Sequence, residues 1–480
     1  MSEASGTAGR PARETGGAGE DAPAQGLDPA LVALALILVL GALTPLLDST
    51  IVNVALHTLG HDLGASVSTV QWVSTGYLLA VATAIPAAGW TAERFGAKRM
   101  WLVSLLVFLG GSVLSGAAWN IGSLVAFRAL QGIGGGLMLP ILQTLLLRAA
   151  AGRPLGRLMA VITLPALVGP ILGPVVGGLL VGHLDWRWIF YVNPPICLGA
   201  LYLAWRHLPA DQPVRGQRLD ITGLLLLSPG LAALVYALAS AGTGGATRTR
   251  VLLPLVLGAA LSGAFALRAL RVRHPLLDLR LFRSRGFAAS SALLFFSGFA
   301  LFGSMLLLPL YYQQVRGASV VAAGLLLVPQ GVGSLLARPA GGLADRIGPR
   351  PVVLGGLALT ALGTLPFAFA AEHPPGPLLG TALVVRGFGL SAANIAIMLG
   401  AYRGLGRAQI PHAGVITRIA QQVGGSFGAA LLAVVLQHAL LTRAPASAYA
   451  LTFAVTLALT VAGGVPALLL PGGADSGHVS

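Results

Sequence analysis

The feature that most constrains this chain is a series of about fourteen stretches long and apolar enough to cross a lipid bilayer. Only 9% of the 480 residues are charged and the mean hydropathy is +0.82, whereas soluble domains carry roughly 25% charged residues. Backbone polar groups must be satisfied internally in lipid, which favours helices. The sequence therefore predicts an all-α polytopic membrane protein, with spans near residues 31–56, 70–92, 100–118, 121–147, 158–181, 188–205, 219–240, 251–267, 287–312, 319–341, 351–371, 378–401, 411–440 and 447–470.

The net charge is +15, and the basic residues are distributed unevenly among the predicted loops. Of the 30 basic residues, 21 fall in the N-terminal tail and every second loop, and five fall in the other loops. Basic residues concentrate on the cytoplasmic side of membrane proteins. We therefore expect both termini in the cytoplasm, an even number of spans and no nucleic-acid partner. The remaining four lie within spans: Arg128, Arg338, Arg386 and Arg418.

Several function classes find no support in the sequence. The single cysteine, Cys197, excludes an intrachain disulfide and a cysteine metal site, and the nine histidines show no metal-ligand spacing. No Ser-His-Asp set or H-E-x-x-H motif is present, so we expect no enzyme, no metal and no cofactor. Residues 1–27 are polar and lack the features of a signal peptide, which predicts a disordered cytoplasmic tail.

An internal repeat divides the chain into two halves. The stretch "GWTAERFGAKR" (Gly89 to Arg99) follows the second predicted span, and "GGLADRIGPR" (Gly341 to Arg350) follows the tenth. In each case an arginine within a span comes next, in "RALQGIGGG" and in "RGFGLSAAN". Such an order is typical of parallel six-helix repeats. The expected organisation is a tail (1–27), an N-terminal half (28–206), a linker with two inserted helices (207–286), a C-terminal half (287–470) and a short tail (471–480).

With these repeats, further motifs resemble the major facilitator superfamily and, more narrowly, its fourteen-helix drug:proton antiporter family. They are "LDSTIVNVAL" (residues 47–56), "QWVSTGYLLA" (71–80), "GPILGPVVGG" (169–178) and "WRWIFYVNPP" (186–195). Glu93 replaces the usual Asp of the loop motif, Thr91 the usual Leu, and His57 the usual Pro of the first motif. The resemblance implies a monomeric, proton-coupled antiporter of the bacterial cell membrane that exports small amphipathic drugs or antibiotics by alternating access.

The two acid-Arg loops are candidate gates. An acid at a cytoplasmic helix end can pair with an arginine or cap a neighbouring helix, where the helix dipole favours an anion. Such a contact would hold the halves together on the inside and break when they rock. The alternative is a solvated turn. The gating candidates are Glu93, Arg94, Gly96, Asp345, Arg346 and Gly348.

Asp48 is the only acid that the sequence places well inside a span. It lies about 26 Å along the first helix, at 1.5 Å per residue, and therefore in the outer half of the membrane. Acids at such depth usually face a bundle interior or a water pathway. We expect Asp48 to carry the coupling proton, with Arg128 as a second coupling residue. The alternative is a structural brace, and the sequence leaves open whether the two side chains touch.

The remaining candidates concern helix packing and substrate. Glycines at i, i+4 and i+8 of the fifth span form a small-residue face that suits tight helix packing, and in the resembling family this motif marks exporters. Its residues are Gly169, Pro170, Gly173, Pro174 and Gly177. The aromatics of "WRWIFYVNPP" are interpreted as an interfacial belt. A mixed aromatic and polar substrate cavity would suit amphipathic compounds, cations included, and its candidates are Asn53, Gln71, Trp72, Tyr77, Gln131 and Asn394.

Two other functions remain open from the sequence. One is a proton-coupled importer or facilitator of another small solute. The other is a non-transporting sensor on the same fold, against which the retained intramembrane charges argue.

Overall fold

The computed structural model is helical throughout the part of the chain that it describes: residues 29–149, 173, 175–209, 219–241, 248–273, 275–369, 374–406 and 408–471. Thirteen helical segments in these ranges are long and apolar enough to cross a membrane. Most of the predicted span at 158–181 lies outside the described residues. Residues 173 and 175–183, at its C-terminal end and just beyond, are described and helical. The all-helical polytopic fold class is confirmed.

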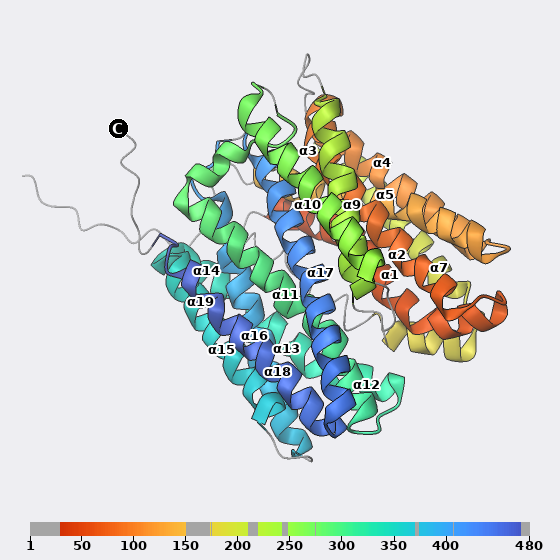
Figure 1. Ribbon diagram of the computed structural model, residues 1–480. Helices are drawn as coiled ribbons and strands as arrows, with labels where there is room; N and C mark the ends of the chain where they lie inside the picture. The colour runs from red at the N-terminus through yellow and green to blue at the C-terminus, as the bar shows by residue number, and fades with distance from the viewer. Residues whose placement is uncertain are drawn as a thin grey trace, which may run out of the picture.

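The first group of helices forms one bundle, drawn from red to yellow in Figure 1. In it α1 packs on α5 and α8, and α5 also packs on α2 and α4. The elements are α1 (Pro29–Asp62), α2 (Val67–Ala84), η1 (Ile85–Ala87), α3 (Ala88–Phe95), α4 (Ala97–Gly116), α5 (Ile121–Ala149), α7 (Trp188–Tyr191) and α8 (Asn193–His207).

A second bundle, green to blue in Figure 1, contains the later helices from α11 onward. Here α11 packs on α16 and α17, and α15 packs on α16 and α18. The elements are α11 (Arg285–Gln314), α12 (Val320–Leu326), α13 (Val328–Leu336), α14 (Ala340–Ile347), α15 (Pro349–Phe369), α16 (Gly376–Tyr402), α17 (Ile410–Thr442), α18 (Pro445–Ala462) and α19 (Gly464–Ala467).

The inserted pair, α9 (Ile221–Ala241) and α10 (Arg248–Arg271), lies beside the seam between the bundles (Figure 1). α9 packs on α2 of the first bundle and on α17 of the second, and α10 packs on α9. The Ser228 hydroxyl donates to the Thr83 carbonyl at 2.8 Å. The chain then continues through η2 (Leu279–Arg283) into α11.

The second and tenth predicted spans are broken rather than continuous, and they break in a similar way. Each ends in an eight-residue helix, α3 or α14, followed by a glycine. Gly96 has φ 91° and Gly348 has φ 88°, a conformation that costs any residue with a Cβ atom. The acid-Arg pairs predicted in loops therefore lie on the last turns of α3 and α14. Glycine lets the chain reverse directly into the next helix.

Candidate functional site

Asp48 lies on α1 with no exposed surface. Its Oδ2 accepts a hydrogen bond from Arg128 Nη1 of α5, and the two side chains form an ion pair. Its Oδ1 accepts from Gln131 Nε2 at 2.9 Å and from Asn193 Nδ2 at 3.0 Å. A buried charge is tolerated only when it is paired and hydrogen-bonded. Three helices therefore converge on this one carboxylate.

Arg128, with 1% of its surface exposed, is equally well satisfied. Its Nη1 also donates to Gln131 Oε1 at 2.7 Å, and its Nε donates to the Val73 carbonyl at 3.3 Å. The guanidinium carbon lies 4.1 Å from the centroid of the Tyr77 ring, a cation–π distance. Asp48, Arg128, Gln131 and Tyr77, predicted separately as coupling or cavity residues, thus form one buried cluster.

Sequence reasoning missed Asn193 and misread its motif. Besides Asp48, the Asn193 amide donates to Ser112 Oγ at 3.0 Å, and that hydroxyl donates to the Phe190 carbonyl at 2.9 Å. The belt interpretation of "WRWIFYVNPP" is wrong for Trp186 and Phe190, which are 1% and 0% exposed. An asparagine before two prolines in an apolar run was the available signal, because buried amides need partners.

The second bundle holds an equivalent arginine without an acid. Arg386 of α16 is 2% exposed. Its Nε donates to Thr364 Oγ1 at 3.1 Å and its Nη1 donates to Gln330 Oε1 at 3.1 Å. Its Nη2 donates to Ser304 Oγ of α11. Every partner recorded for Arg386 in the described residues is neutral, whereas Arg128 faces a carboxylate.

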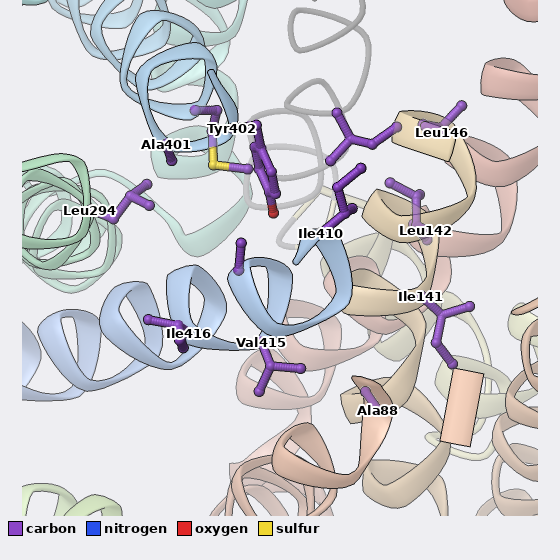
Figure 2. Close-up of a cluster of buried hydrophobic side chains, with 14 of the residues drawn as sticks. Ala88, Ile141, Leu142, Leu146, Leu294, Ala401, Tyr402, Ile410, Val415 and Ile416 are labelled. Carbon is purple, nitrogen blue, oxygen red and sulfur yellow. The ribbon is translucent and has the colours of Figure 1, made fainter. Parts of the chain in front are cut away.

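The two bundles meet in one apolar cluster at the end that carries α3 and α14. Figure 2 shows Ala88, Ile141, Leu142 and Leu146 of the first bundle facing Leu294, Ala401, Tyr402, Ile410, Val415 and Ile416 of the second. Within it, the Tyr402 hydroxyl donates to Gln143 Oε1 of α5 at 3.1 Å. Towards the opposite end, each bundle has a separate apolar cluster. The contact between bundles is therefore concentrated at one end.

The gating candidates lie at this joined end. Glu93 is 6% exposed, and Arg94 and Arg346 are exposed. α3 packs on α17 across the seam, where Gly89 approaches the Pro411 carbonyl. α14, in contrast, packs on α15 and α16 of its own bundle. The geometry places Glu93 beside the seam, and the gating role of the six residues stays a prediction.

Residues 38–429 match the family described as the Major Facilitator Superfamily. The chain belongs to the major facilitator superfamily. Multidrug resistance protein B homolog of Mycobacterium tuberculosis is 42% identical over 417 residues, 86% of this chain and 77% of that protein. Puromycin resistance protein pur8 of Streptomyces alboniger is 35% identical over 421 residues, 86% of this chain and 83% of that protein.

A solved structure shows the same fold. The proton:xylose symporter XylE aligns with a TM-score of 0.62 at 18% identity, over 91% of this chain and 94% of that chain. This superfamily member is thus a transporter, not an enzyme, and a multi-pass protein of the bacterial plasma membrane. The resemblance to the drug-efflux branch is confirmed by the resistance proteins among its relatives.

The small-residue motif of this superfamily member packs against α1 just beyond Asp48. A methyl group on Gly177 would lie 3.2 Å from the Ile51 carbonyl oxygen, and one on Gly173 would collide with Thr50. Glycine at both positions therefore permits the close approach that the motif predicts. Gly169, Pro170 and Pro174 lie outside the described residues.

The other cavity candidates do not join the Asp48 cluster. Trp72 stacks on Tyr236 of α9, with ring centroids 5.8 Å apart, and Gln71 beside it is exposed. Asn394 donates to Ser297 Oγ at 2.7 Å between α16 and α11. The side chain of Asn53 lies outside the described residues. A substrate-contacting role for these four residues stays a prediction.

Proposed function

We propose that this transporter exports amphipathic drugs or antibiotics from the cytoplasm in exchange for protons. Its relatives include proteins named for multidrug and puromycin resistance, which supports efflux as the direction of transport. The proton serves as the coupling ion, and we expect a monomer that needs no cofactor. The fold supports alternating access, in which two halves rock around a central site.

The observation that carries the proposal is the Asp48–Arg128 pair. Within the described helices, Asp48 is the only acidic side chain more than one turn from a helix end. An acid kept in this position is costly, which favours a functional role. Protonation would remove the charge that holds Arg128, Gln131 and Asn193 around one carboxylate. The helices α1, α5 and α8 that supply these side chains would then be free to repack.

The positive-inside rule supplies a direction for this cycle. The joined end of the bundles carries Arg94, Lys98 and Arg346, so we assign it to the cytoplasm. The apolar cluster then closes the cytoplasmic side in this structure. In that state Asp48 would be reached by protons from outside. A subsequent rocking of the halves would open the cytoplasmic side, where the proton leaves and the drug enters.

The alternatives predict different behaviour. An importer or facilitator would move its solute inward or only down a gradient, and a sensor would move none. The shared fold with the xylose symporter does not decide between them, because a fold hosts many functions. Everted membrane vesicles separate them, since export from the cell becomes accumulation in the vesicle.

Asp48→Asn is the deciding variant. Asparagine keeps the size and the acceptor oxygen but cannot take up or release a proton. The wild-type protein should accumulate drug when the vesicle lumen is acidified. Asp48→Asn should lose that accumulation yet still exchange labelled for unlabelled drug without a gradient, and Asp48→Glu should retain part of it. Wild-type accumulation by Asp48→Asn at matched protein levels would make Asp48 a structural brace.

A further inference from the structure

The interior of the described bundles carries more positive than negative charge. Three arginines lie more than one turn from a helix end: Arg128, Arg386 and Arg418. Asp48 is their only acidic counterpart in the described helices, and residues 150–174 contain no acidic residue in the sequence. The Asp48 carboxylate already accepts from Arg128, Gln131 and Asn193. Its charge is therefore not free to attract a cation.

Arg418 lies on the face of α17 that turns toward the first bundle. Gly414, one turn earlier on the same face, would place a methyl group 3.4 Å from Gln143 Oε1 and 3.7 Å from the Pro140 carbonyl of α5. Further along α17, Gly424 and Gly428 meet the backbone of α11. Arg418 also interacts electrostatically with Tyr77 of α2. Its charge thus lies at the seam between the bundles.

The guanidinium of Arg418 retains binding capacity. Its recorded hydrogen bond is from Nη1 to Gln421 Oε1 at 3.1 Å, a neutral partner on the same helix. Arginine has five N–H donors, arranged to bind a carboxylate through two parallel bonds. The side chain is partly exposed, unlike Arg128 and Arg386, and forms no ion pair within the described residues. It can therefore receive a ligand without breaking an existing charge pair.

We infer that Arg418 contacts the substrate and selects amphipathic compounds bearing an acidic group over cationic ones. The inference rests on the proposed transport function, since it names the charge class that the path between the halves accepts. An anion at Arg418 would gain charge-assisted hydrogen bonds. A cation would face like charges, and the described helices offer no unengaged acid more than one turn from their ends to offset them.

Direct binding to the purified transporter in lipid nanodiscs tests the charge preference. Three probes share one fluorophore and differ in charge: dansylglycine is an anion, its methyl ester is neutral, and dansylcadaverine is a cation. The wild-type protein should bind the anion most tightly and the cation most weakly. Equal or weaker affinity for the anion than for the cation, or no binding of the anion, would overturn the inference without any variant.

Variants then assign the preference to one residue. Arg418→Gln should weaken binding of the anion about tenfold, from the loss of a charged hydrogen bond, and leave the ester within about twofold. The affinity of Arg418→Lys for the anion should lie between those of the wild-type protein and Arg418→Gln, because lysine keeps the charge but not the two-bond geometry. Arg271→Gln, which removes an exposed arginine at the end of α10, should change nothing. An unchanged affinity of Arg418→Gln for the anion would refute the role of Arg418.

The same probes separate this inference from the proposed function. Proton-driven accumulation of the ester in everted vesicles reports export itself, independent of substrate charge. Proton-driven accumulation of the cation with exclusion of the anion would keep the proposed function and overturn the role of Arg418. Selective binding of the anion without proton-driven accumulation of any probe would keep the role of Arg418 and overturn the proposed function.

Discussion

The hydrogen bond between Tyr402 and Gln143 crosses from one bundle to the other, so its removal should shift the balance between conformations. It joins α16 to α5 at 3.1 Å inside the apolar cluster of Figure 2. A buried neutral hydrogen bond contributes about 0.5–1.5 kcal/mol net. Tyr402→Phe keeps the ring and its apolar contacts. The population of molecules in which the bundles are open at the end that carries α3 and α14 should therefore rise about 2- to 13-fold, since 1.4 kcal/mol corresponds to a factor of ten.

Thiol accessibility measures this population. Ala88 is 1% exposed in the cluster, so Ala88→Cys reacts with a water-soluble maleimide only when the cluster opens. The Cys197→Ser background removes the single native thiol. Tyr449→Phe is the matched control, because it deletes a 2.9 Å Tyr–Gln hydrogen bond that lies within the second bundle. Equal labelling rates for the two Phe variants would refute the reasoning that the Tyr402 bond holds the bundles together.

Two further predictions concern stability. Asn193→Leu removes a hydrogen-bond donor from the Asp48 carboxylate and should destabilise the purified protein by about 1.5–3 kcal/mol. The loss should exceed that of Asn394→Leu, because the Asn394 amide donates only to a hydroxyl. A smaller loss of stability in thermal unfolding for Asn193→Leu than for Asn394→Leu would contradict this prediction. Burial opposes ionisation of Asp220, but the Gly223 amide and Arg268 outweigh it and lower its pKa. The ionised Asp220 therefore contributes to folding stability above about pH 4, and this contribution is lost as the pH falls through the lowered pKa. Asp220→Asn should reduce the melting temperature at pH 7 but not in strong acid. Equal reductions of the melting temperature at both pH values would argue against this prediction.

The bundle organisation was predictable because it follows from hydropathy, which can be summed over each stretch of the sequence. Hydropathy located the spans, with boundaries mostly within a few residues of the helices. The breaks inside the second and tenth spans were not predicted, since they depend on where the backbone can bend. Prolines stand at these breaks: Pro86 in η1, Pro329 in the first turn of α13 and Pro339 just before α14. Hydropathy averaged over a span does not register single residues.

The site was predictable to the extent that isolated charges in apolar spans are costly wherever they lie. That argument found Asp48 and Arg128, but not their contact, because the register between α1 and α5 is set by packing. Asn193 escaped because one amide in an apolar run carries a smaller penalty than a charge. Trp72 illustrates the converse, since its sequence neighbourhood pointed to a cavity while the inserted helix α9 supplies its stacking partner.

The repeat predicts two equivalent arginines, and the structure shows why equivalence ends there. Arg128 and Arg386 each reach the first helix of their own bundle, where they meet Asp48 and Ser304 respectively. A hydroxyl accepts a hydrogen bond as a neutral group, whereas a carboxylate accepts it as an anion. The same geometry therefore holds an ion pair in one half and an arginine among neutral partners in the other. In the proposed mechanism, protonation of Asp48 would therefore act on the first half, while the partners of Arg386 in the second half stay neutral.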